Sequence, residues 1–157
     1  NVNKPVELDL IGAFSTFGLK KKFHDNVLEL DLYDQVNLID HMPRNELYDR
    51  LSEYNYGICY LPVLDVFEQN SPIKLLEYIA AGLQVVSTPQ NLNAKIIQGT
   101  SLGVISKSDG VKDFAEAMYE ATILGYIPAD ANSVLKDYDC KLIRKKLLEF
   151  IVKSTEG

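Results

Sequence analysis

The chain has 157 residues, of which 46% are hydrophobic and 24% are charged, as in an ordinary globular protein, and this length predicts one domain over residues 1–157. The formal net charge of −6 argues against a nucleic-acid-binding protein, because no basic stripe offsets it. The chain has two cysteines, Cys59 and Cys140, and Cys59 lies in an apolar strand pattern, which predicts a buried free thiol and not a disulfide framework. No signal peptide or membrane-spanning run is evident, which favours a cytoplasmic protein.

Short apolar segments alternate with amphipathic segments along the chain. The short ones predict five strands, at residues 6–11, 36–39, 56–61, 85–88 and 102–105. The amphipathic ones predict helices over 18–33, from Pro43, over 71–82, within 89–98, over 111–124 and over about 139–153. Strands that alternate with helices predict an α/β fold, here a Rossmann-like parallel sheet of about five strands flanked by helices.

The most informative segment is 70–88, where a predicted helix runs directly into a buried strand. Ser71 is a favourable N-cap, Pro72 suits the first helical position, and Gly82 is a natural stop. One face of this helix carries the polar or small residues Asn70, Lys74, Glu77 and Ala81, and the opposite face carries apolar residues at core spacing, namely Ile73, Leu76, Ala80 and Leu83. Because helix N-termini at the edge of a parallel sheet bind phosphates, the segment predicts a phosphate-binding site.

The same residues carry a resemblance to a known family. Tyr60-Leu61-Pro62, followed by Asn70 to Val86 with its Pro-x-Lys-x-x-Glu-Tyr-x-Ala-x-Gly pattern, resembles the donor-binding motif of GT-B-fold glycosyltransferases of the retaining group 1 family (family 4). Leu10-Ile11-Gly12 resembles a family strand that ends in glycine. Val36 to Pro43, followed by Glu46-Leu47, resembles the family's V-x-F-x-G-x-V-P … E-L segment. The resemblance covers about residues 6–125 and implies the C-terminal, nucleotide-sugar-binding lobe of such an enzyme.

The resemblance implies a role for each matching residue. Glu77 would accept hydrogen bonds from the ribose hydroxyls, since an ionised carboxylate is a strong double acceptor. The backbone around Ser71, Pro72 and Ile73 would face the diphosphate or the donor sugar, although Pro72 has no N–H to donate. Lys74 would add positive charge beside the phosphates or pair with Glu77. The other implied contacts are the nucleobase for His41 and Met42, the wall of the donor cleft for Gly12, and the sugar end of the donor for Gln69. Asn70 belongs to the same nucleotide-sugar-binding site.

The chain also departs from the family pattern. Gln69 stands where many members have a glutamate that touches the donor sugar, and an amide cannot stabilise positive charge at the anomeric carbon. Asp40 stands where the family often has glycine, and Gln84 where it usually has proline. A first strand and helix with an Arg and a Lys for the diphosphate are missing, as is the N-terminal lobe with its catalytic His. We therefore expect a fragment that has no catalytic residue of its own and is inactive alone.

The implied function is the donor-binding part of a hexosyltransferase that needs no metal or other cofactor and acts in cell-surface polysaccharide or glycoconjugate synthesis. A carbohydrate or lipid-linked acceptor would bind through the missing lobe. The alternative is a non-catalytic Rossmann-like module that has lost the donor site, in which Glu77 is a surface residue paired with Lys74. The basic helix predicted near the C-terminus is either solvated or in peripheral contact with a membrane, and an edge left by a missing strand would favour dimerisation.

Overall fold

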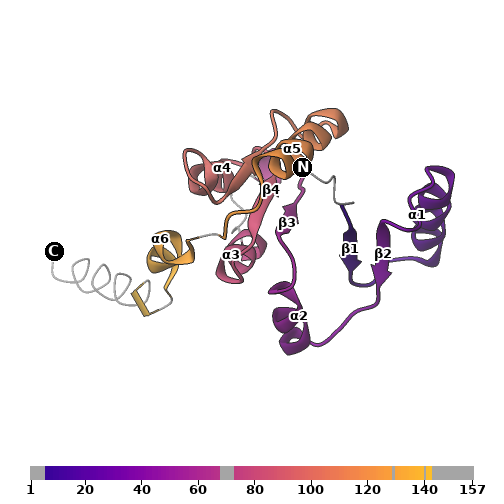
Figure 1. Ribbon diagram of the computed structural model, residues 1–157, viewed down its shortest axis with the longest axis horizontal. Coiled ribbons are helices and arrows are strands. Elements are labelled where there is room, and N and C mark those ends of the chain that lie inside the picture. The colour runs from indigo at the N-terminus through magenta and orange to yellow at the C-terminus, as the bar shows by residue number, and fades with distance from the viewer. Residues whose placement is uncertain (1–5, 68–72, 129, 140, 143–157) are drawn as a thin grey trace. The chain divides into compact units, whose positions relative to one another are not determined.

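The computed structural model describes residues 6–67, 73–128, 130–139 and 141–142 of the chain. The chain divides into two compact units, Asn1–Leu47 and Tyr48–Gly157. Each unit contains its own parallel sheet with helices between the strands (Figure 1).

The first unit is a single β-α-β element. Strands β1 (Leu8–Ile11) and β2 (Val36–Ile39) pair in parallel, with each residue of one strand opposite its counterpart in the other. Helix α1 (Phe17–Glu29) connects them, and the Thr16 hydroxyl caps it by accepting a hydrogen bond from the Leu19 backbone N–H at 3.3 Å. The helix ends earlier than the predicted 18–33 because the chain turns at Asp31, which has a φ of +54°, a conformation that aspartate tolerates better than most residues.

The second unit is built on a three-stranded parallel sheet. Strands β3 (Tyr56–Cys59), β4 (Gln84–Ser87) and β5 (Gly103–Ile105) pair in that order. Helix α2 (Arg44–Leu51), which contains the boundary between the two units, precedes β3, and a short 3₁₀ helix, η1 (Asp65–Phe67), follows it. The strands are followed by helices in turn: α3 (Ile73–Ala80), α4 (Asn91–Ile97) and α5 (Val111–Leu124).

Helices cover both faces of this second sheet. On one face the side chains of Cys59 and Val85 form a cluster with buried residues of α3 and α4, namely Leu75, Ile79, Ile96 and Ile97. On the other face Val86 packs with α5 through Phe114, Ala117 and Ala121. Because successive residues of a strand point to opposite faces, neighbours such as Val85 and Val86 belong to different layers. The unit is therefore a three-layer α/β/α arrangement.

The α/β class, the parallel pairing and the five strands agree with the sequence prediction. The strands fall into two sheets, one of two strands and one of three, where the sequence predicted one. The segment from Asp40 to Asn55, which contains α2, runs between the last strand of one sheet and the first strand of the other. Periodicity identifies which residues form strands, but it does not say which strand edges pair.

Helix α3 is buried on a different side from the one predicted. Leu75 and Ile79 are 1% and 0% exposed, whereas Ile73 is 59% exposed and Ala80 is also exposed. The prediction that Ile73 and Ala80 face the core was therefore wrong, although Leu83 is buried as predicted. The physical reason is that α3 is apolar around most of its circumference, so that two stripes have helical spacing and only contact with the sheet selects between them.

The C-terminal region contains structure that the sequence did not predict. Helix α6 (Ala131–Leu135) and a 3₁₀ helix, η2 (Lys136–Tyr138), lie between the helices predicted over 111–124 and about 139–153, where no helix or strand was predicted. Asp130 starts α6, because its side chain accepts a hydrogen bond from the Asn132 backbone N–H at 3.2 Å. Nearly all of the helix predicted over 139–153 lies outside the described residues. None of the helices in the described ranges is long and apolar enough to cross a bilayer.

Cys59 is a buried free thiol, as predicted, and burial raises its pKa from 9.0 to about 12 against the opposing charge of Lys74. Because the thiolate is the reactive form, we expect Cys59 to resist iodoacetamide in the folded chain at about pH 8. Between pH 9.0 and about 12 this thiol loses its proton in the unfolded chain but keeps it in the folded chain. The free energy of unfolding should therefore fall over this interval.

The measurement for this prediction is the alkylation rate of a Cys140→Ser variant, which leaves Cys59 as the one thiol, with and without denaturant. Equal rates in the two conditions would show that Cys59 is accessible and would contradict the prediction.

Candidate functional site

Glu77, the residue that the sequence favours most, lies midway along α3 with its side chain half-buried. Its Oε1 accepts a hydrogen bond from the Tyr48 hydroxyl of α2 at 2.7 Å. A hydroxyl that donates to an ionised carboxylate makes a short, charge-assisted bond. The Tyr48 hydroxyl is therefore one of the groups that orient this carboxylate.

Helix α3 is fixed on the sheet around Glu77. The ring of Tyr78 lies directly over Gly57 of β3, where an added Cβ would overlap the ring. Desolvation raises the pKa of Tyr78, and the nearby Cys59 and Glu77 raise it further. Gly82 ends the helix as predicted, with a φ of +86°. The close approach of the Tyr78 ring to Gly57 thus helps to fix α3, which carries Glu77, on the sheet.

Of the other site residues predicted in and before this helix, the structure describes two. Ile73 and Lys74 form the first turn of α3, and both side chains are exposed. The predicted residues Gln69, Asn70, Ser71 and Pro72 lie outside the described ranges. Contact of that backbone with a diphosphate therefore stays a prediction.

Polar side chains that follow β4 and β5 bond to the chain just after β3, at residues 61–63. The side chains of Thr88, Gln90 and Asp109 bond to backbone groups of residues 61–63 at 3.1, 2.7 and 2.8 Å respectively. Thr88 and Gln90 are only 0% and 5% exposed. Sequence reasoning did not select them, although a Thr and a Gln directly after a buried strand were a usable signal, because ligand sites in α/β proteins form at the carboxyl ends of strands.

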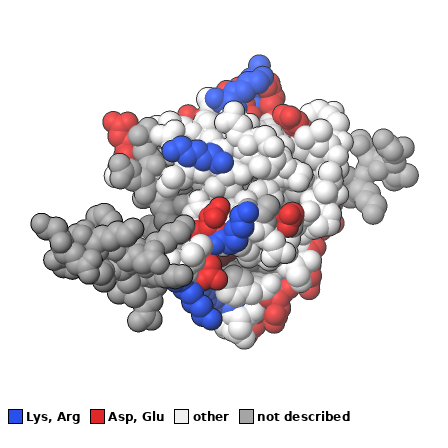
Figure 2. All heavy atoms as spheres, turned by 90° about the vertical axis from the view of Figure 1, so that its left-hand side faces the viewer, with Lys and Arg blue, Asp and Glu red and all other residues white. Residues whose placement is uncertain are grey.

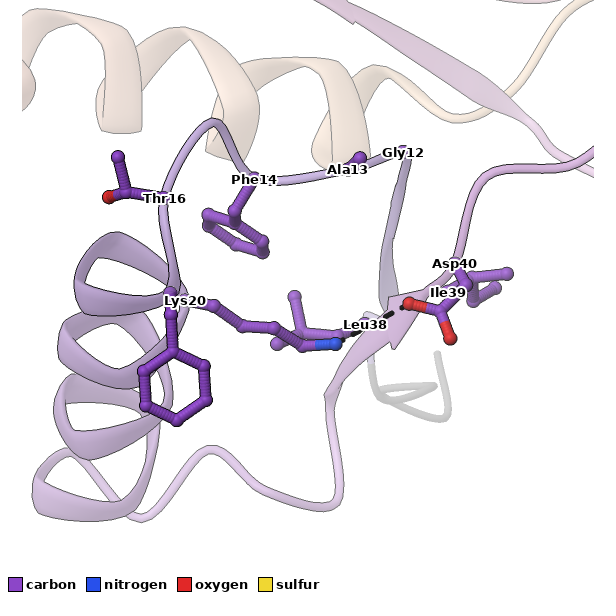
Figure 3. Close-up of a pocket in the computed structure, with 9 residues that line it drawn as sticks. Gly12, Ala13, Phe14, Thr16, Lys20, Leu38, Ile39 and Asp40 are labelled. Atoms are coloured by element: carbon purple, nitrogen blue, oxygen red, sulfur yellow. Dashed lines mark hydrogen bonds and ion pairs between the residues drawn. The ribbon is translucent and has the colours of Figure 1, made fainter.

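In the first unit, a cavity of about 190 Å³ opens at the carboxyl ends of β1 and β2. Gly12, with a φ of +142°, ends β1 and lines the cavity together with Phe14. Figure 3 shows the Lys20 side chain crossing towards Asp40, and the distance from Nζ to Oδ1 is 3.4 Å. The cavity thus offers an aromatic ring, a cation and a carboxylate. Asp40, one of the departures from the family pattern, has a partner in Lys20.

The predicted nucleobase contacts follow this cavity in the chain. His41 is exposed and Met42 is half-buried, and neither lines the cavity. Gly12, His41 and Met42 belong to the first unit, whereas Ile73, Lys74 and Glu77 belong to the second.

Charges of both signs are mixed on the surface. On the face drawn in Figure 2, Lys and Arg side chains lie among Asp and Glu side chains, and no region of a single sign stands out. On α5, Glu116 pairs with Lys107 at 3.6 Å and with Lys112 at 4.0 Å. Within the described ranges, no group of three or more His, Cys, Asp or Glu residues could hold a metal ion.

Fold and site define an α/β protein of the Rossmann-like type. No protein-family model matches the chain, and no curated protein shows significant similarity to it. Arguments about function therefore depend on the residues of the chain itself.

Proposed function

We propose that the chain is the donor-binding part of a retaining GT-B glycosyltransferase and holds a nucleoside-diphosphate sugar. The observation that carries the proposal is the half-buried Glu77 carboxylate on α3, held by the Tyr48 hydroxyl at 2.7 Å. An ionised carboxylate has about four acceptor positions, so the bond from Tyr48 does not by itself exhaust them. Hydroxyl groups of a ribose are donors of the kind that this carboxylate can accept.

The exposed Lys74 supports the diphosphate part of this proposal. It lies in the first turn of α3, one turn before Glu77, so that a ligand on the ribose-binding face would have a cation nearby. In glycosyl transfer the bond from the anomeric carbon to the diphosphate breaks, and negative charge builds up on the leaving group. Positive charge at a helix N-terminus stabilises that developing charge. The acceptor and the catalytic groups would come from a further lobe.

In the first unit, the cavity beside Gly12 and Phe14 is a candidate ligand site in its own right. It lies at the carboxyl ends of parallel strands, which is where α/β proteins bind ligands. His41 and Met42 follow directly after Asp40, which lines the cavity.

We place the chain in the cytoplasm or at its membrane face, within cell-surface polysaccharide or glycoconjugate synthesis. The free, buried thiol of Cys59 is compatible with a reducing compartment.

The proposal predicts that the chain binds a nucleoside diphosphate and that Glu77→Gln weakens the binding at least about tenfold, because a hydrogen bond to a charged group contributes about 1.5–3 kcal/mol. Isothermal titration with UDP, GDP and ADP measures this. Glu116→Gln is the matched control, since its carboxylate lies on α5 and pairs only with surface lysines in the described structure. Unchanged affinity in Glu77→Gln would refute the ribose-binding role, and absence of nucleotide binding would favour the non-catalytic module.

A further inference from the structure

Tyr48 is the partner that the structure gives to Glu77. It lies on α2, 29 residues earlier in the chain, and its hydroxyl donates to Glu77 Oε1 at 2.7 Å. The Tyr48 side chain is half-exposed, at 37%, and that of Glu77 is half-buried. Neither group is sealed in the core, so a ligand could reach both from solvent.

The direction of this hydrogen bond determines whether a ligand group that binds to both side chains must be a donor or an acceptor. The phenolic proton of Tyr48 is donated to Glu77, so the phenolic oxygen offers only lone pairs to another partner. An ionised Glu77 also offers only lone pairs. A group that binds beside both must therefore be a hydrogen-bond donor. Hydroxyls satisfy this requirement, whereas a phosphate or a carboxylate would be repelled.

We propose that Tyr48 is a positioning residue of the nucleotide site: it orients Glu77, and its phenolic oxygen accepts a hydrogen bond from one ribose hydroxyl while Glu77 accepts one from the other, so that the pair selects ribonucleotides over deoxyribonucleotides. This inference rests on the proposed function, because it takes Glu77 as the ribose-binding residue. A glutamate that is already oriented loses less side-chain freedom when the ligand binds, which increases affinity. A site built to bond a hydroxyl also discriminates against the analogue that lacks it.

The test is titration of the 157-residue chain with UDP, GDP and ADP and with their 2′-deoxy and 3′-deoxy analogues. For the nucleotide that binds, Tyr48→Phe should weaken binding roughly three- to tenfold, as expected for loss of one hydrogen bond. The deoxy analogue that lacks the hydroxyl bonded to Tyr48 should bind to Tyr48→Phe almost as well as to the wild type. The affinity for the ribonucleotide divided by the affinity for this analogue should therefore be lower in the variant. A purely structural role of Tyr48 would weaken binding of all these ligands equally.

Tyr119→Phe is the matched control, because Tyr119 is a 68% exposed tyrosine on α5 and the change is the same. Its affinities and its ratio should equal those of the wild type. Far-UV circular dichroism of each variant verifies that the fold is retained.

The outcomes separate this inference from the proposed function. If the wild type binds no nucleotide, or if Glu77→Gln leaves affinity unchanged, the proposed function fails and this inference fails with it. If Glu77→Gln weakens binding but Tyr48→Phe leaves the affinity and the ratio unchanged, only the role of Tyr48 is overturned. Tighter binding in Tyr48→Phe would show that the Tyr48 hydroxyl competes with the ligand for Glu77, and this result would also overturn the role proposed for Tyr48.

Discussion

Replacing Ile79 with alanine is expected to lower the free energy of unfolding by about 4 kcal/mol, within the range for buried Leu or Ile to Ala changes. Ile79 is 0% exposed and lies in the cluster that joins α3 to β3 and β4, beside Leu75 and Val85. The loss has two parts: the transfer free energy of the deleted groups and the cavity that remains. The helix is poorly able to move inward and fill this cavity, because the Tyr78 ring already contacts Gly57 in the strand below it.

Ile73→Ala is the matched control for this prediction, because it makes the same change in the same helix at a side chain that is 59% exposed. Its cost should stay within about 1 kcal/mol, because alanine also has the higher helix propensity. Urea denaturation followed by far-UV circular dichroism measures both variants. Similar losses at the two positions would mean that the stripe through Ile73 contributes to the core as much as the stripe through Ile79.

These two isoleucines show which part of the fold the sequence predicts and which part it does not. Both lie at helical spacing from other apolar residues, and the sequence selected Ile73 for the core while the structure buries Ile79. In α5, polar residues separate the apolar ones more clearly, so that its pattern predicts a single stripe of Phe114, Ala117, Met118 and Ala121. Of these, Met118 is half-buried and the other three are buried. Periodicity therefore places a helix correctly, but it selects the buried face only when a single apolar stripe is present.

In the candidate site, sequence reasoning identified one residue but not its hydrogen-bond partner. Glu77 could be selected from a local motif because its neighbours in the motif lie within a few residues. Tyr48 could not, since it reaches Glu77 from another helix 29 residues away and no local pattern marks a tyrosine as its donor. The pairing of Lys20 with Asp40 depends in the same way on α1 lying beside the end of β2. Contacts of this kind follow from the topology, which a single sequence specifies only indirectly.

Gly103→Ala is the second large effect that we expect, with a loss of about 3 kcal/mol in the free energy of unfolding, at the upper end of the usual cost of overpacking. Gly103 opens β5 and pairs with Val85 of β4. A Cβ at this position would overlap the carbonyl oxygen of Val85 and also approach its carbonyl carbon and its amide nitrogen. These are main-chain atoms of a central strand, so a rotamer change cannot remove the overlap, and relief requires the two strands to separate.

Separation of β5 from β4 would also weaken the hydrogen bond from the Ser106 backbone N–H to the Ser87 carbonyl, which is 2.9 Å long at the carboxyl end of the pair. Gly110→Ala is the control, because Gly110 is the N-cap of α5 with a φ of −65°, and its added Cβ would meet only the Ser108 hydroxyl, at 3.1 Å. Alanine is a poorer N-cap than glycine by less than about 1 kcal/mol. Urea midpoints of the two variants should therefore differ clearly. If Gly103→Ala were as stable as Gly110→Ala, the close approach of β5 to β4 at Gly103 would not constrain this position, and the loss expected for Gly103→Ala would be wrong.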